Sequence, residues 1–341
     1  MILILTEPVS GRDSGGLGRL GEVVTVAFEE GRLASPSGAD LALYHMAASS
    51  GTRGVLLINH GLAEHARRYE SFAAAMAARG FAVYTHDHRG HGATRSAAHL
   101  QGRFAPDDGI GAVLADVAAV RNHAVSRHPG LPVILFGHSM GGLIALNAAE
   151  AEPGLYDCLA VWNANFNPGL AGRFGQGLLA IERMLKGSDV PSPLVDRLSF
   201  GTWARTIPAR RTDLDWLSHD PAEVDRYIAD PLCGFDVTVS LWIDLFRMSY
   251  AGAQPDRLRQ LPPGMSINLV GGGEDPATEK GKAMQWLQAR MKTAGLREVT
   301  ATIYPGARHE TLNDTIREQA IDDFSAWCLR VVEKRDESSA A

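Results

Sequence analysis

Short apolar runs alternate with stretches of helical periodicity along most of the chain. The helical stretches repeat apolar residues every three or four positions, as in residues 67–79, which carry Tyr69, Phe72 and Met76 on one face. This order predicts a mostly parallel sheet with helices on both faces and ligands at the carboxyl ends of its strands. The runs that we interpret as buried strands are residues 54–59, 81–85, 132–136, 156–162, 265–270 and 299–304.

The two ends of the chain do not follow this alternation of strands and helices. Residues 23–30 and 41–46 alternate apolar and polar side chains around the turn Pro36-Ser37-Gly38, which predicts a hairpin before the first parallel strand. We expect the glycine-rich residues 1–21 and the polar residues 335–341 to be flexible.

The segment 165–235 interrupts the alternation. It separates the strand that ends at residue 162 from a helix expected at 237–250, and this is too long for a simple connection. We therefore predict a helical cap of residues 165–235 on a core formed by residues 22–164 and 236–334.

One apolar stripe runs through the first part of the predicted cap. It is consistent with packing onto the core or with a surface that meets lipid, which would allow transient membrane contact. Asp220-Pro221 and Asp230-Pro231 further on both resemble helix starts. The stripe consists of Leu170, Phe174, Leu178, Ile181 and Leu185.

Residues 137–141 read Gly-His-Ser-Met-Gly and lie between a predicted strand and a predicted helix. This context predicts a sharp turn that lifts Ser139 above the sheet, since the flanking glycines allow close backbone approach. The backbone N–H of Met140 would then lie at a helix N-terminus, where a developing negative charge is favoured.

A nucleophilic serine needs a histidine base and a carboxylate that orients it, in the chain order serine, acid, histidine. Asp275 follows the strand 265–270 in a glycine-rich turn, and His309 follows the strand 299–304. Glu274 is adjacent to Asp275 and competes with it for the role of the acid.

A second oxyanion donor is expected after an earlier strand. His60-Gly61-Leu62 follows the strand 54–59, so the backbone N–H of Leu62 is the candidate donor.

These motifs together resemble the monoacylglycerol lipase and lysophospholipase-like branch (serine aminopeptidase S33-type) of the α/β-hydrolase superfamily. The resemblance implies an α/β-hydrolase fold with a mostly parallel eight-stranded sheet, an inserted cap and no cofactor. It also implies the roles derived above for Ser139, Asp275, His309, Leu62 and Met140. The segments that carry it are His60–His65 with Arg68 and Tyr69, Asp87–Gly92, Gly137–Gly142 and Tyr304–Glu310.

Composition narrows the class of protein and its expected cellular compartment. The chain has 341 residues, 45% hydrophobic and 21% charged, and a net charge of −6, which argues against a nucleic-acid-binding protein. The cysteines at 158, 233 and 328 have neither metal-site nor disulfide spacing, and residues 1–5 are too short for a signal segment. We therefore expect a cytoplasmic protein.

Other chemistries remain open. His86, His88 and His91 have a spacing that resembles a zinc hydrolase, although position 90 is glycine where that pattern has aspartate. The other interpretation is that Asp87 and Arg89 make this a polar loop that braces the catalytic turn. A non-catalytic scaffold would be expected to lack one member of the Ser139, Asp275 and His309 set.

The sequence thus predicts a serine carboxylic-ester hydrolase without a metal ion that acts through an acyl-enzyme. Its expected substrate is a monoacylglycerol, a lysophospholipid or a similar single-chain ester. Because the fold supports several reactions, hydrolysis of small esters, lactones or C–C bonds is the alternative.

Overall fold

The computed structural model describes residues 27–340, with side chains through residue 335. Its strands form one sheet in the order β1-β2-β4-β3-β6-β7-β8-β9, and the very short β5 pairs with β2. The pairs from β4–β3 to β8–β9 are parallel, and β2 is antiparallel to β1, β4 and β5. This confirms the predicted mostly parallel sheet of eight main strands. The bounds are β1 Glu29–Ala34, β2 Ala39–Met46, β3 Gly54–Asn59, β4 Phe81–His86, β5 Arg95–Ser96, β6 Val133–His138, β7 Cys158–Trp162, β8 Ser266–Gly272 and β9 Val299–Tyr304.

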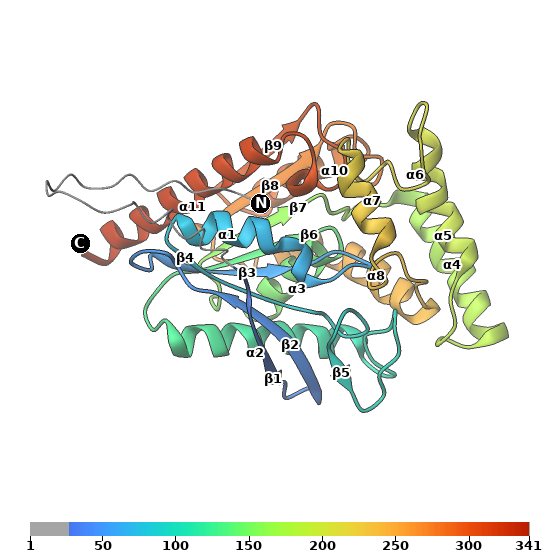
Figure 1. Ribbon diagram of the computed structural model, residues 1–341, viewed down its shortest axis with the longest axis horizontal. Coiled ribbons are helices and arrows are strands. Elements are labelled where there is room, and N and C mark those ends of the chain that lie inside the picture. The colour runs from blue at the N-terminus through green and yellow to red at the C-terminus, as the bar shows by residue number, and fades with distance from the viewer. Residues whose placement is uncertain (1–26, 341) are drawn as a thin grey trace, which may run out of the picture.

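Helices cover both faces of the sheet (Figure 1). One hydrophobic cluster joins the sheet to α2 (Gly109–Arg127), α3 (Met140–Ala151), α8 (Val239–Ala251) and α10 (Lys282–Thr293). The other joins the opposite face to α1 (Glu70–Ala78) and α11 (Arg317–Ala340).

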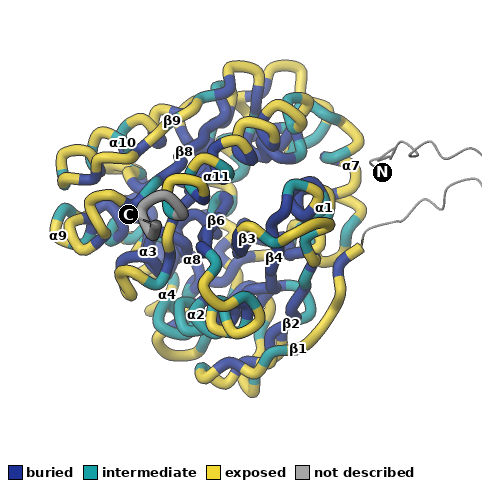
Figure 2. Tube along the Cα trace, turned by 90° about the vertical axis from the view of Figure 1, so that its left-hand side faces the viewer, coloured by how far each residue is buried: buried dark blue, intermediate teal, exposed yellow. Residues whose placement is uncertain are grey.

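The central strands supply both clusters because their side chains alternate between the two faces. In β3, Val55 and Leu57 belong to the first cluster, whereas Leu56 and Ile58 belong to the second. Figure 2 shows the consequence, since the strands at the centre are buried while the outer helices turn exposed surfaces to solvent.

The predicted hairpin is present around the turn at residues 36–38, but its first strand lies further along the chain than predicted. β1 runs over Glu29–Ala34 rather than residues 23–30, and it pairs with β2 so that Glu29 faces His45. β1 is an exposed edge strand, so burial does not impose the alternation on which the prediction relied. Residues 23–26 and the segment 1–21 lie outside the described residues.

Two helix bounds also differ from expectation, and a third is set by local backbone angles. The helix predicted over residues 67–79 is a 3₁₀ turn, η1 (Ala66–Tyr69), followed by α1. α10 begins at Lys282, because residues 279–281 have positive φ angles that end the helical path before it. α11 continues to Ala340, so most of the segment 335–341 that we expected to be flexible is helical.

The segment inserted between β7 and α8 is helical, as predicted. Asp220 begins α7, where its side chain accepts a hydrogen bond from the Ala222 N–H. Asp230 does not begin a helix, which corrects the prediction, because it follows the last turn of α7. Figure 1 shows the inserted helices gathered at one end of the sheet. They are α4 (Gly169–Lys186), α5 (Pro193–Leu198), α6 (Phe200–Thr206) and α7 (Pro221–Ala229), and the short α9 (Pro255–Leu258) follows α8.

Apart from Leu178, which is half-buried, the apolar stripe of α4 does not pack onto the core. Leu170 is 88% exposed and Leu185 80%, and Phe174 and Ile181 are exposed as well. The buried positions of α4 are instead Gly172, Gly175 and Leu179, which lie on another face of the helix. The core-packing interpretation of the stripe is therefore wrong, and a surface that meets lipid stays a prediction. None of the described helices is long and apolar enough to span a membrane.

Candidate active site

Ser139 lies on a sharp turn between β6 and α3, with φ 54° and ψ −119°. The turn brings backbones so close that a Cβ at Gly137 would lie 2.0 Å from the Gly141 carbonyl oxygen. A Cβ at Gly141 would lie 2.0 Å from the carbonyl oxygen of Asn59 on β3. Only glycine fits at both positions, so the predicted strand–turn–helix arrangement is confirmed.

The three predicted side chains meet at the carboxyl edge of the sheet. His309 Nε2 lies 2.9 Å from Ser139 Oγ, and His309 Nδ1 lies 3.0 Å from Asp275 Oδ2. With Nδ1–H donating to the carboxylate, Nε2 is free to accept the serine proton. Asp275 and His309 are buried. The geometry is that of a nucleophile, a base and an orienting acid.

Asp275 is held as a carboxylate by its neighbours. Its burial alone would raise its pKa, but the charge of His309 and hydrogen bonds from His309, Thr278 and Asn163 lower the pKa below its ordinary value. Thr278 Oγ1 donates to Asp275 Oδ2 at 2.7 Å and Asn163 Nδ2 at 3.1 Å. Neither residue was predicted from the sequence, although Asn163 directly follows the strand β7, and a polar residue at that edge of the sheet is a usable signal.

Glu274 points elsewhere. Its Oε2 lies 3.0 Å from His219 Nε2 in the cap, and its side chain is about half exposed. The structure therefore places only one of the two competing carboxylates, Asp275, at His309.

The candidate oxyanion residues flank the serine. Leu62 and Met140 line the same cavity as Ser139. The loop that carries Leu62 is fixed by Glu64, whose Oε1 accepts the Gly61 N–H at 2.5 Å. It is also fixed by His60, whose Nε2 accepts the His88 N–H at 2.9 Å.

A buried charge network that was not predicted from the sequence joins this loop to the histidine loop. Arg68 donates to Glu64 at 2.5 Å and to both carboxylate oxygens of Glu310 at 2.6 and 2.7 Å. His138 Nε2 donates to the His309 carbonyl at 2.9 Å. Burial alone would lower the pKa of His138, but Glu64 raises it above its ordinary value. The serine, oxyanion and histidine loops are thus tied together through charged side chains.

A cavity of about 610 Å³ opens above Ser139 and His309 and reaches under the cap. This volume is typical of small-molecule sites, which are mostly apolar with a few placed polar groups. Its apolar walls include Leu143, Val195, Phe200, Trp203, Trp216 and Phe246.

The three histidines of the zinc alternative do not converge on one point. Among the described residues, His86, His88 and His91 do not form a group whose ligand atoms all lie within 4.8 Å of one another. Asp87 accepts the backbone N–H groups of Ala66 and Ala93, so this loop hydrogen-bonds neighbouring backbone, but these bonds do not reach the turn at Ser139.

The neighbouring buried residues His60 and His91 predict that the fold loses stability in acid. Burial lowers the pKa of His60 and of His91 from 6.5 to about 3, so both are neutral in the fold. The stability that these two neutral histidines contribute is complete above pH ~6.5. It is lost as the pH falls towards 3, because in that range the unfolded chain binds protons that the folded chain does not. Each residue should remove about 1.4 kcal/mol of unfolding free energy per pH unit in that window.

Urea unfolding between about pH 4 and pH 7 measures this slope. His91→Asn should reduce the slope of unfolding free energy against pH by the amount that one histidine contributes. His123→Asn, at a half-buried position of α2, should change this slope less. A stability that does not depend on pH in this range would contradict the prediction.

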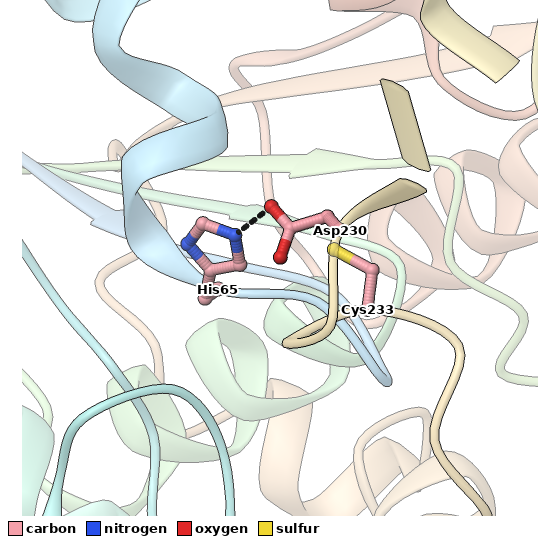
Figure 3. A group of neighbouring side chains, drawn as sticks. All are labelled: His65, Asp230 and Cys233. Carbon is pink, nitrogen blue, oxygen red and sulfur yellow. Dashed lines mark hydrogen bonds and ion pairs between the residues drawn. The ribbon is translucent and has the colours of Figure 1, made fainter. Parts of the chain in front are cut away.

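One described trio of potential metal ligands does converge. Atoms of His65, Asp230 and Cys233 lie within 4.8 Å of one another (Figure 3). His65 Nε2 donates to Asp230 Oδ2 at 2.9 Å, so these two already satisfy each other. Burial raises the pKa of the Cys233 thiol, which disfavours the thiolate that zinc binds. The trio therefore joins the cap to the core as a hydrogen-bonded contact.

Comparisons with known proteins show similarity to lipases and esterases. The chain is 28% identical over 280 residues to a monoacylglycerol lipase of Mycolicibacterium smegmatis, covering 81% of this chain and 88% of that protein. It is 27% identical over 263 residues to the monoglyceride lipase of Homo sapiens, covering 75% of each. Its fold matches the structure of a highly thermostable carboxyl esterase from Bacillus coagulans in complex with glycerol, with a TM-score of 0.81, 24% identity and coverage of 90% of this chain and 100% of that one.

The match to a family model extends well beyond the motifs. Residues 50–316 match the family described as serine aminopeptidase, S33, a stretch that contains every candidate site residue and the inserted helices. This confirms the resemblance found in the sequence. The chain belongs to the serine aminopeptidase S33 family of α/β-hydrolases.

Proposed function

We propose that the protein is a serine carboxylic-ester hydrolase that acts on a single-chain lipid ester through an acyl-enzyme. The observation that carries the proposal is the Ser139–His309–Asp275 chain of hydrogen bonds at the floor of a largely apolar cavity. A hydrolytic serine needs the hydrogen-bonded histidine and carboxylate, and an acyl chain needs the apolar cavity.

In the proposed reaction, Ser139 Oγ attacks the ester carbonyl carbon while its proton passes to His309 Nε2. Asp275 keeps the imidazole in the required tautomer and stabilises the imidazolium. The backbone N–H groups of Leu62 and Met140 bind the negative oxygen of the tetrahedral intermediate. His309 then protonates the departing alcohol, and it takes a proton from the water that hydrolyses the acyl-enzyme.

We infer that the substrate is a monoacylglycerol, a lysophospholipid or a similar ester. The apolar cavity walls support this inference, as do the lipase names of relatives that are 27% and 28% identical. Hydrolysis of small esters, lactones or C–C bonds remains the alternative, and small substrates would fill only part of the cavity.

Two measurements on one sample test the proposal. A fluorophosphonate should label a single residue, which mass mapping should identify as Ser139, and Ser139→Ala should not be labelled. Glycerol esters of increasing acyl length should then show a rising kcat/KM, by up to about fourfold per methylene until the cavity is filled. Labelling without any gain from longer chains would favour the alternative, and labelling at another serine would refute the mechanism.

A further inference from the structure

A segment of the cap lies directly against the loop that carries His309. Residues 215–219, between α6 and α7, form what we call the cap strap, and residues 307–314 form the base loop. The His309 N–H donates to the Trp216 carbonyl at 3.3 Å, and the Glu310 N–H donates to the Leu217 carbonyl at 2.8 Å. The N–H group of the candidate base is therefore hydrogen-bonded to the cap, whereas its carbonyl accepts from His138 at the end of β6.

Arg308 fastens the two segments together. Its Nη1 donates to the carbonyl oxygens of Asp215 at 2.7 Å and Ser218 at 3.0 Å. These two carbonyls flank the pair that receives the N–H groups of His309 and Glu310. A charged donor forms stronger hydrogen bonds than a neutral one, so the guanidinium holds both ends of this contact.

The far end of the base loop is tied to the strap as well. Asp314 is buried and accepts the backbone N–H of Arg308 at 2.6 Å and that of His219 at 3.0 Å. Ser218 Oγ donates to the Asn313 carbonyl at 2.9 Å. The base loop is therefore hydrogen-bonded to the strap near both of its ends.

Arg308 does not lie in the cavity. Trp216, Leu217 and His309 line the cavity, whereas Arg308 is not among the described residues that form its walls. An effect of Arg308 on the reaction would therefore pass through the position of His309 and not through contact with substrate.

We propose that Arg308 is a positioning residue that fastens the cap strap to the base loop and so sets the place of the His309 imidazole relative to Ser139. This inference rests on the proposed function, in which His309 is the base. The cap then has a part in catalysis besides covering the substrate, and its strap stays attached to the core during turnover. A displacement of the base by about 1 Å can cost about 10²-fold in rate.

Arg317 provides a matched control. It also ties the cap to the core, since it donates to Asp220 at 2.6 Å and to Glu223 at 2.7 Å. Its side chain holds α7 against α11 and makes no contact with His309. A role that is only structural would make the two arginines equivalent.

The test compares Arg308→Ala with Arg317→Ala on a short ester, 4-nitrophenyl butyrate, and on a long one, monooleoylglycerol. Arg308→Ala should lower kcat by about 10- to 100-fold on both esters and change KM by less than about threefold. Arg317→Ala should keep kcat within about threefold of wild type. Arg308→Lys should recover part of the loss, because its ammonium can still donate to a strap carbonyl.

Equal effects of the two alanine variants, or a change confined to KM for the long ester, would overturn the proposal. Thermal unfolding of both variants shows whether they are equally folded, and Arg308→Gln serves for the same comparison if Arg308→Ala does not fold. Failure of the proposed function has a different signature, because turnover would then survive in Ser139→Ala whatever the Arg308 variants do.

Discussion

Ser139→Ala should reduce kcat for ester hydrolysis by about 10⁵- to 10⁶-fold while leaving the fold intact. The change removes the attacking oxygen and the hydrogen bond to His309 Nε2, and no other hydroxyl takes that place in the described hydrogen bonds of His309. A residual rate above that of water is expected from the oxyanion donors and from binding. Steady-state kinetics on a soluble ester and on a glycerol ester measure the loss.

The fold should tolerate the change because alanine occupies less volume and the strained backbone of the turn is the same for both residues. Thermal unfolding should therefore give a midpoint within a few degrees of wild type. Turnover above about 1% of wild type in a correctly folded variant would show that Ser139 is not the nucleophile.

Asp275→Asn should lower kcat by about 10⁴-fold, whereas Glu274→Gln should change it by less than about threefold. An amide at position 275 no longer holds the His309 Nδ1–H and favours the wrong tautomer. It would also turn a donor group towards a site that already receives N–H or O–H groups from Asn163, Thr278 and Ala277. The carboxylate of Glu274 faces His219 and solvent instead.

The pair is a matched comparison of neighbouring carboxylates, each replaced by its own amide. Both variants should be measured with the same ester at saturating concentration, together with their unfolding midpoints. A larger loss in Glu274→Gln than in Asp275→Asn would mean that the histidine takes its orientation from the other acid during turnover.

Local patterns in the sequence were enough for the parts of this protein that depend on near neighbours. The strand over residues 299–304 has the predicted bounds, because a short stretch of mainly β-branched and aromatic residues before a Pro-Gly turn favours a strand. The turn at Ser139 was predictable for a similar reason, since glycines two positions before and after it are required wherever a helix follows a strand so sharply. The order of serine, acid and histidine after separate strands then placed them at one edge, since parallel strands end together.

The tertiary structure alone decided which of Glu274 and Asp275 lies at His309, because adjacent side chains point apart and the turn in three dimensions sets which one faces inward. It also decided that the stripe on α4 is exposed, since helical periodicity identifies an apolar face but not what covers it. The contact between the cap strap and the base loop joins residues about ninety positions apart, and the strap groups that Arg308, His309 and Glu310 bind there are all backbone carbonyls. Backbone groups are the same at every residue, so no side-chain pattern in the sequence announces such a contact.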